Sequence, residues 1–415
     1  MLKSLRQFFK QLSKSKEPKK DFKKPAIALI TYSRVEYFTK VFDSITKQEI
    51  NNKPFNHSFD LYVFQDGLLA GETPEQVQGH REIAELIRSN PNELKYFPQT
   101  KNLGVALHFD FIERFLFNKQ DCPWVAFCED DLVLSPGYLE TLLCMANSFK
   151  DDERVAMFSC FGKTSNQSIE NQKEHQHDLI AMEHHWGFGM HQPAWRKRQP
   201  LVDEYLKLVS SVPYRERNHV AIQNWHDFCG FKPGPSSQDY AKACAMAAMG
   251  CIKVSSYANF ATYVGEYGLH FTPELYAQKG YAHSNVFPTP INRSFSLDDL
   301  TYKSLLQKQQ SLTIKDFEKF DSVDFKQRLE IGALSPNNSD QWLNSTITEA
   351  DVVAAYKIFL GRWPENREDI KGRIGMSPEK LFASFMTSTE FRDRKQFYPV
   401  LVALAKEIIE KSKSK

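Results

Sequence analysis

From Ala26 onward, short apolar segments alternate with longer segments in which apolar residues recur every three or four positions. The short segments predict buried strands, and the longer ones predict amphipathic helices. Because the two kinds alternate, the pattern indicates an α/β fold with a mostly parallel sheet and crossover helices. The predicted strands are Ala26–Tyr32, Leu61–Phe64, Leu94–Phe97, Trp124–Cys128 and Val155–Ser159, and the helices between them are Tyr37–Thr46, Gln76–Ser89, Val105–Phe117 and Gly137–Phe149.

The alternation stops near Gly162, and the polar, His-containing stretch from Gly162 to Asp178 predicts a mobile loop. Beyond it the chain is rich in aromatic residues to about Phe287, with one more helix predicted over Gln238–Met249. Residues 288–345 are less regular and are expected to form a connector.

A small all-α domain is predicted after this connector. Thr348, with Asp351 three residues later, is a typical helix N-cap, and Gly361 follows the apolar face. Ser377, followed by a proline, marks a second helix start. The chain therefore divides into a basic N-terminal segment (1–24), an α/β domain (25–287), a connector (288–345) and a helical domain (346–415).

The composition, with 41% hydrophobic and 25% charged residues, is that of a soluble globular protein. No apolar stretch reaches the ~18 residues of a transmembrane helix, and no apolar core of a secretory signal follows the N-terminal charges. The seven cysteines are odd in number and form no CxxC pair, which predicts buried thiols in a reducing compartment. A cytoplasmic location is therefore expected.

The net charge of +2 does not indicate a nucleic-acid partner, but the charge is placed unevenly. Residues 1–24 contain nine Lys or Arg and two acids, with Leu and Phe at helical spacing. A basic amphipathic helix resting on the inner face of a membrane and a solvated, frayed N-terminus both fit this pattern.

Three consecutive acids, Glu129, Asp130 and Asp131, directly follow the predicted strand Trp124–Cys128. Open α/β sheets bind ligands at the carboxyl ends of their strands. Ser135 and the proline after it are expected to begin the next helix, which leaves the acids without a capping role. Carboxylates ~4 Å apart repel by roughly 4 kcal/mol per pair at an effective dielectric of 20, so a divalent cation would stabilise the cluster. Oxygen ligands favour Mn²⁺ or Mg²⁺, and a solvated acidic turn is the alternative.

The acidic segment and its surroundings resemble a known family. The stretch AFCEDDLVLSPGYL, which ends at Leu139, resembles the acidic motif and following helix of glycosyltransferases of the N-acetylglucosaminyltransferase I type, which have the GT-A fold. Three more segments match in the family's order within about residues 25–285: IALITYSR at Ile27–Arg34, VFQDG at Val63–Gly67 and NLGVALHF at Asn102–Phe109.

This resemblance implies a GT-A-like catalytic domain and a role for each matching residue. Asp131 would be the main protein ligand of the metal ion. Without the resemblance, Arg34 is equally a surface cation, and Asp66 with the glycine after it an ordinary turn. The residues that would hold the nucleotide or the donor sugar are Thr31, Arg34, Asp66, Glu129 and Asp130.

Two later segments add to the predicted site. HWGFG at His185–Gly189 resembles the family's Trp/Gly-rich segment, so Trp186 and Gly187 would lie against the donor sugar, with a strand packing its aromatics into the core as the alternative. SQDY at Ser237–Tyr240 resembles the place of the family's catalytic base, although the tryptophan that flanks it in relatives is absent here. Asp239 is thus the candidate base, or alternatively a helix cap.

Further matches are shorter. VGEYGLH at Val264–His270 resembles a late motif of bacterial relatives and makes Glu266 and His270 secondary candidates. The histidines from His175 to His191 have no Cys or carboxylate at ligand spacing, so they are interpreted as solvated or aromatic-layer residues and not as a zinc site. The terminal segments FLGRWPENREDI and FMTSTEFRDR resemble a small helical domain of unknown function found on bacterial glycosyltransferases.

Together with the acidic cluster, this resemblance implies an inverting, metal-dependent glycosyltransferase that moves a sugar from a nucleotide diphosphate sugar, a UDP-sugar, to a hydroxyl of a bacterial glycan or glycoconjugate. A sugar nucleotidyltransferase would need a Gly-rich, Lys-bearing phosphate loop after the first strand, and residues 31–36 contain none. A non-catalytic glycan-binding or scaffolding protein would have no need of the three acids.

Overall fold

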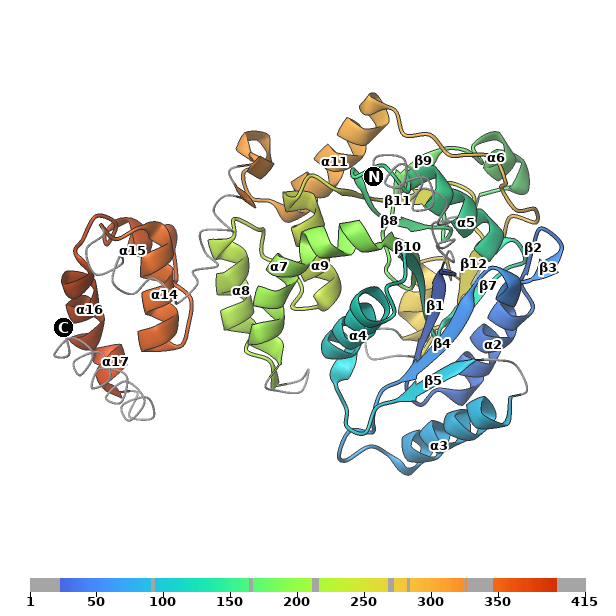
Figure 1. The fold of residues 1–415 in the computed structure, drawn as a ribbon, viewed down its shortest axis with the longest axis horizontal. Coiled ribbons are helices and arrows are strands. Elements are labelled where there is room, and N and C mark those ends of the chain that lie inside the picture. Colours follow the sequence, from blue (N-terminus) through green and yellow to red (C-terminus); the bar gives the residue numbers. More distant parts are fainter. Residues whose placement is uncertain are drawn as a thin grey trace, which may run out of the picture.

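The computed structural model describes residues 23–90, 94–163, 167–210, 216–267, 272–281, 284–323, 325–326 and 346–393. An eight-stranded sheet with helices on its faces forms the main body, and the C-terminal helices form a smaller body beside it (Figure 1). The predicted α/β fold with a helical C-terminal region is confirmed.

The sheet has the strand order β5-β4-β1-β6-β10-β8-β11-β9. The strands from β5 to β6 are parallel neighbours, and β8 is parallel to β11. Strands β10 and β9 run against their neighbours, so the sheet is mixed but mostly parallel. The bounds are β1 Ala26–Thr31, β4 Asp60–Gln65, β5 Lys95–Pro98, β6 Trp124–Glu129, β8 Val155–Ser159, β9 Leu179–Ala181, β10 Gly187–His191 and β11 Ile252–Ser256.

Strand β1 is buried on both faces, and its side chains divide the interior into two cores. Ala26 and Ala28 belong to one core, while Ile27 and Leu29 belong to the other. Helices α2 (Val35–Thr46), α3 (Pro74–Ser89) and α5 (Tyr138–Phe149) contribute to the second core, and α4 (Gly104–Arg114), α7 (Gln192–Val209) and α9 (Gln238–Ala248) to the first. The main body is therefore a helix–sheet–helix sandwich.

The order of the strands reverses beside β1. The chain passes outward from β1 to β4 and β5, then returns to place β6 on the other side of β1. Open α/β sheets bind ligands outside the carboxyl ends of the strands at such a switch point. Here those ends are Thr31 of β1 and Glu129 of β6.

Several local predictions are wrong. The stretch predicted as a mobile loop contains helix α6 (Ile169–Glu174). Helix α5 begins after Gly137, whose φ is +89°, and not at a cap formed by Ser135. The hydroxyl of Ser135 instead donates to the carbonyl of Phe260. The two-stranded pair of β7 (Leu132–Leu134) and β12 (Ala261–Tyr263), which follows the acids, was not predicted.

The predicted caps of the C-terminal helices are confirmed. Thr348 and Asp351 form a capping box at the start of α14 (Glu349–Leu360), which ends at Gly361 with φ +59°. The hydroxyl of Ser377 accepts from the backbone N–H of Lys380 at the start of α16. The remaining helices are α8 His219–Phe228, α10 Pro273–Gln278, α11 Asp299–Thr313, α15 Arg367–Lys371, α16 Pro378–Met386 and α17 Thr389–Asp393.

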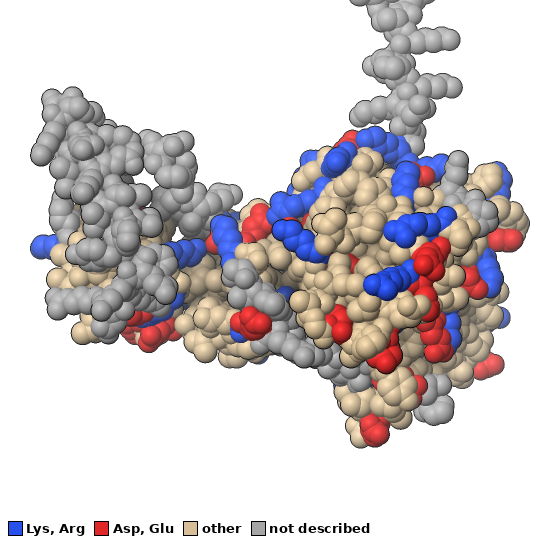
Figure 2. All heavy atoms as spheres, turned by 90° about the horizontal axis from the view of Figure 1, so that it is seen from below, with Lys and Arg blue, Asp and Glu red and all other residues tan. Residues whose placement is uncertain are grey.

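The predicted basic N-terminal helix lies outside the described residues, apart from positions 23 and 24. Within the described part of the chain, no helix combines the length and apolarity that a membrane crossing requires. On the face of the main body drawn in Figure 2, Lys and Arg side chains gather over the upper part, and Asp and Glu side chains lie mostly below them.

Candidate functional site

Glu129, Asp130 and Asp131, hereafter the acidic edge, lie where β6 ends, at the switch point of the sheet. The backbone N–H of Glu129 donates to the carbonyl of Trp186 at 2.8 Å, and the carbonyl of Asp131 accepts from the N–H of Val264 at 2.8 Å. The backbone of the acidic edge is therefore fixed from both sides, by the segment before β10 and by the segment after β12.

The carboxyl end of β1 supplies partners for these acids. The hydroxyl of Thr31 donates to Asp130 Oδ2 at 2.8 Å. Arg34 Nη2 donates to Asp130 Oδ1, and to Asp131 Oδ2 at 2.9 Å. The structure thus brings together four of the predicted site residues. Arg34 thus partly neutralises the acids, a role for which only a metal ion was predicted.

One guanidinium does not balance three carboxylates. Asp130 and Asp131 are 3% and 5% exposed, and burial raises the pKa of Asp131 to about 6 although Arg34 opposes the change. Burial and the neighbouring charges of Asp131, Asp239 and Asp130 hold the pKa of Glu129 well above its usual range. The acidic edge therefore favours further positive charge.

One atom of the acidic edge is suited to a metal ion. Asp131 Oδ1 is buried and has no hydrogen-bond partner within the described part of the chain. Mg²⁺ is commonly held by one or two carboxylates together with substrate phosphates, and a single orphaned carboxylate oxygen fits that pattern. No group of three or more His, Cys, Asp or Glu side chains among the described residues is arranged to hold a metal on its own. An ion here would need oxygens from a bound ligand.

Asp66 follows β4 and makes structural hydrogen bonds. Its carboxylate accepts from the backbone N–H of Gly67 at 2.8 Å, and from those of Leu103 and Gly104 at 2.9 Å. Asn102 Nδ2 adds a contact of 3.3 Å. These bonds join the loop after β4 to the start of α4, so Asp66 has a structural role whether or not it also contacts a nucleotide.

Trp186 and Gly187 lie where β10 begins. The indole of Trp186 is stacked between His184 and Tyr263, with ring centroids 4.1 Å and 3.7 Å away. A Cβ atom on Gly187 would come within 2.3 Å of the Leu132 side chain, so a larger residue there would require that side chain to move. His184 is thus an aromatic-layer residue, as predicted, and contact of Trp186 with a donor sugar stays a prediction.

Asp239 is the second residue of α9, and Ser237 is the helix cap because its side chain accepts from the N–H of Tyr240. The alternative that Asp239 caps the helix is therefore wrong. Its side chain is 49% exposed and accepts from His185 Nδ1 at 3.1 Å. Burial alone would raise the pKa of Asp239, but this hydrogen bond and the positive charges of Lys242 and Lys253 outweigh it and lower the pKa.

The charge of Asp239 on α9 also contributes to the raised pKa of Glu129. His185 is buried with its ring centroid 5.8 Å from that of Phe188, so it is an aromatic-layer residue and not a solvated one. Its Nε2 atom lies 3.0 Å from Lys253 Nζ of β11. No sequence signal could indicate the contacts of His185 with Asp239 and Lys253, because these partners are 54 and 68 positions away.

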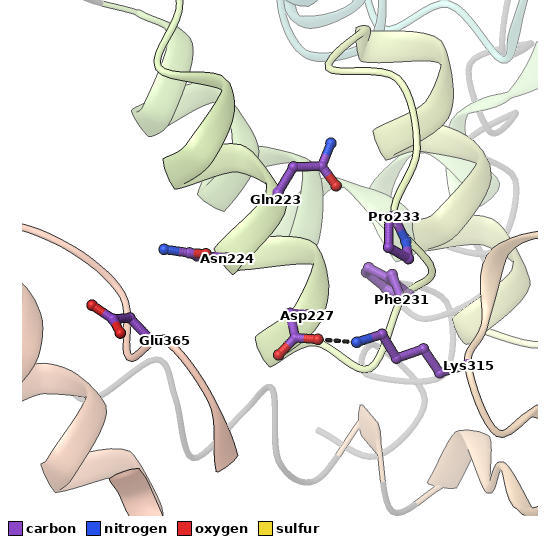
Figure 3. A pocket seen from close by; sticks show the side chains of 7 residues that line it. All are labelled: Gln223, Asn224, Asp227, Phe231, Pro233, Lys315 and Glu365. Carbon is purple, nitrogen blue, oxygen red and sulfur yellow. Dashed lines mark hydrogen bonds and ion pairs between the residues drawn. The ribbon is translucent and has the colours of Figure 1, made fainter. Parts of the chain in front are cut away.

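Other acidic candidates differ in their surroundings. Asp227 of α8 points toward Lys315 and forms an ion pair with it (Figure 3). Glu266 is half-buried in the segment after β12. His270 lies outside the described residues. A cavity of about 400 Å³ beside Asp227 is lined by Gln223, Asn224, Asp227, Phe231, Pro233, Lys315 and Glu365, none of which belongs to the acidic edge.

This chain is similar to known proteins only at the level of solved structures. No protein-family model and no curated protein matches this chain. Among solved structures, it is similar to a mannosyltransferase from Pyrobaculum calidifontis in complex with GDP-Man and Mn²⁺, with 12% identity over 97% of this chain and 93% of that one, and a TM-score of 0.34.

Two other glycosyltransferase structures are similar at the same low level. An active-site mutant of LgtC matches with 8% identity over 76% of this chain and 98% of its own, and a TM-score of 0.30. The glycosyltransferase GlyE of Streptococcus pneumoniae matches with 13% identity over 46% of this chain and 41% of its own, and a TM-score of 0.25. Because every TM-score is below 0.5, these likenesses establish neither the family nor the activity of this chain.

Proposed function

We propose that the chain is a GT-A-like glycosyltransferase that takes a sugar from a nucleotide diphosphate sugar, a UDP-sugar, and transfers it to a hydroxyl of a bacterial glycan or glycoconjugate with inversion at the anomeric carbon. The observation that supports this proposal most is the acidic edge at the switch point, where three carboxylates share one cation and the charge of the half-exposed Asp239 acts on Glu129.

The donor would be held by residues of β1 and β6. Arg34 keeps 35% of its side chain exposed while Nη2 is bound to the acids, so its outer edge can pair with a phosphate. Asp131 Oδ1 would ligate Mn²⁺ or Mg²⁺ together with the diphosphate oxygens. When bound, the ion would stabilise negative charge on the leaving nucleotide diphosphate.

Asp239 would act as the general base. An ionised carboxylate accepts the proton of the acceptor hydroxyl while that oxygen bonds to the anomeric carbon. The bond between the anomeric carbon and the diphosphate breaks in the same step, and the nucleotide diphosphate leaves with the bonding electrons. A general base must be ionised and must be accessible to the acceptor. Asp239 is ionised because its pKa is lowered, and it is accessible because half of its side chain is exposed.

Calorimetric titration of UDP with Mn²⁺ tests the donor part of the proposal. Asp131→Ala should abolish the Mn²⁺-dependent part of the affinity, because the change removes the only carboxylate oxygen proposed as a metal ligand. Asp43→Asn, at a surface acid of α2 that pairs with Lys47, is the control and should bind as the wild type does. Equal affinity of Asp131→Ala and wild type would overturn the metal assignment.

Transfer or slow hydrolysis of a UDP-sugar tests the base. Asp239→Asn should lower turnover by roughly 100-fold or more while the affinity for UDP and the melting temperature stay near wild type. A protein that binds UDP tightly yet turns over no donor, in the wild type as in the variant, would favour a non-catalytic glycan-binding or scaffolding protein.

A further inference from the structure

The buried residues behind Asp239 form a line of polar groups. Lys253 Nζ lies 3.0 Å from His185 Nε2, and His185 Nδ1 lies 3.1 Å from Asp239 Oδ1. Lys253 belongs to β11, His185 to the segment before β10, and Asp239 to α9. The three residues therefore connect the sheet interior to the half-exposed carboxylate through one imidazole ring.

The chemistry of these groups fixes the direction of each hydrogen bond. A lysine ammonium has three donors and no acceptor, so it can only donate to His185 Nε2. A neutral imidazole that accepts at Nε2 must carry its hydrogen on Nδ1, which then donates to the carboxylate of Asp239. Burial, followed by the charge of Lys253, lowers the pKa of His185 to about 4, which keeps the ring in this neutral form.

Two hydrogen bonds between the backbone of Lys253 and the side chain of Gln309 hold Lys253 in place. Its N–H donates to Gln309 Oε1 at 3.1 Å, and its carbonyl accepts from Gln309 Nε2 at 2.8 Å, which ties β11 to α11. The carboxylate is fixed from a second side because Gln238 Nε2 donates to Asp239 Oδ1 at 3.0 Å. One oxygen of Asp239 thus receives two donors, and no hydrogen bond within the described residues is recorded for Oδ2.

We propose that His185 and Lys253 are positioning residues for Asp239: Lys253 sets the tautomer of His185, and His185 holds the Asp239 carboxylate ionised and turned so that one oxygen faces the acceptor hydroxyl. This inference rests on the proposed function, because it assigns Asp239 the task of the base. Neither residue touches a substrate in this scheme.

Other charges around Asp239 determine how far its pKa would shift if His185 were replaced. Lys242 of α9 adds positive charge that lowers the pKa of Asp239, while Glu129 of β6 faces it as a like charge. Lys242 is itself paired with the buried Glu113. Removing His185 should therefore shift the pKa of Asp239 upward without neutralising it. The titratable groups whose charges interact with His185, Asp239 or Lys253 are Glu129, His184, Lys242 and Cys244.

Steady-state kinetics with a UDP-sugar over a range of pH test the inference. His185→Leu removes the donor to Asp239, so kcat should fall roughly 10- to 100-fold, while the KM for the donor stays within about twofold. The acid limb of kcat/KM should move to higher pH by about one unit, because the carboxylate loses a hydrogen bond that favours its ionised form. His185→Asn keeps an amide N–H near the position of Nδ1 and should recover most of the loss.

Two further variants separate positioning from packing. Lys253→Met retains the length of the stem but frees His185 to take the other tautomer, so it should lower kcat less than His185→Leu does. His226→Leu replaces another buried histidine, on α8, and should leave kcat and the pH profile unchanged. If His185→Leu does not fold, the proposal is tested with Lys253→Met and His185→Asn. A wild-type kcat and a wild-type pH profile in Lys253→Met would then overturn it.

The outcomes distinguish failure of the positioning role from failure of the proposed function. Wild-type kcat and pH profile in His185→Leu, together with an inactive Asp239→Asn, overturn the positioning role and leave the proposed function standing. Absence of turnover in the wild-type protein with every UDP-sugar, with no difference among the variants, overturns the proposed function and the positioning role with it. A lower kcat, an acid limb at higher pH and recovery in His185→Asn support both.

Discussion

Two groups of charged side chains in the main body differ in how their charges are balanced. At the acidic edge, three carboxylates face the single guanidinium of Arg34. In the interior, one carboxylate faces two cations: Glu113 Oε1 of α4 accepts from Arg198 Nη2 of α7 at 2.6 Å and from Lys242 Nζ of α9 at 2.7 Å. All three interior residues are at most 2% exposed.

The difference separates a structural use of buried charge from a functional one. The interior group joins three helices, and no side chain in it reaches solvent, so nothing can bind to it without unfolding the body. The acidic edge is itself largely buried, but it lies at the end of the strands and its partner Arg34 keeps 35% of its side chain exposed, so its deficit of positive charge can be met by an ion bound together with a ligand. Buried charge alone is therefore a weak sign of function, while unbalanced charge at a reachable strand end is a stronger one.

The largest expected effect is on the interior group. Glu113→Gln leaves two buried cations without a counter-charge, so it should lower the free energy of unfolding by about 3–5 kcal/mol. Urea denaturation at neutral pH measures this loss. Asp43→Asn is the matched control, because Asp43 pairs with Lys47 at 3.0 Å on the surface of α2 and should cost at most about 0.5 kcal/mol. Similar losses in both variants would contradict a special role for the interior group.

The next effect appears as acid sensitivity. Burial lowers the pKa of His108 in α4 to about 4, while an unfolded histidine titrates near 6.5. Between these values the unfolded chain binds more protons, so His108 makes wild-type stability fall as the pH drops from about 6.5 to 4, by up to about 3 kcal/mol. His108→Gln lacks this component. Denaturation at several pH values should give the variant the shallower decline, and parallel curves would contradict the assignment.

A smaller effect is expected when the acidic edge is neutralised. Asp131→Asn removes a carboxylate whose ionised form is disfavoured by burial. The free energy of unfolding should therefore change by less than about 1 kcal/mol, and a small increase is expected. Differential scanning calorimetry of the ligand-free protein measures this. A loss as large as that of Glu113→Gln would mean that both groups are structural and would remove the contrast between them.

The smallest effect is expected from the helical domain. Helices α14 and α16 have their own caps, and Lys357 of α14 pairs with Glu204 of α7 at 3.0 Å, a residue that belongs to neither charged group. Deleting residues 346–415 should therefore change the affinity for UDP with Mn²⁺ by no more than about twofold. If the shortened protein does not bind UDP, the domain is part of the site.

The parts predicted correctly from sequence are those set by local pattern. Strands β1, β4, β5, β6 and β8 and the helices between them follow from runs such as Ala26–Tyr32, because burial on both faces demands continuous apolar sequence, whereas β11, which is parallel to β8, was not predicted. Strand β10 was predicted only as the alternative interpretation of His185–Gly189, because its five residues include two glycines, which are depleted in strands. The pairing of Arg34 with Asp130 and Asp131 depends on β1 lying beside β6, and only the topology determines that.

The position of β10 has a consequence for the order in which the protein can fold. This strand lies between β6 and β8, so it joins strands 26–129 to the rest of the sheet only after residue 191 has left the ribosome. Until then the apolar strand Trp124–Glu129 has an unpaired edge, which is the kind of surface on which chains aggregate. Glycine at 189, where a Cβ would lie 2.2 Å from the ring of Phe158, lets the late strand close that edge. A bulkier residue there would prolong the most vulnerable stage of synthesis.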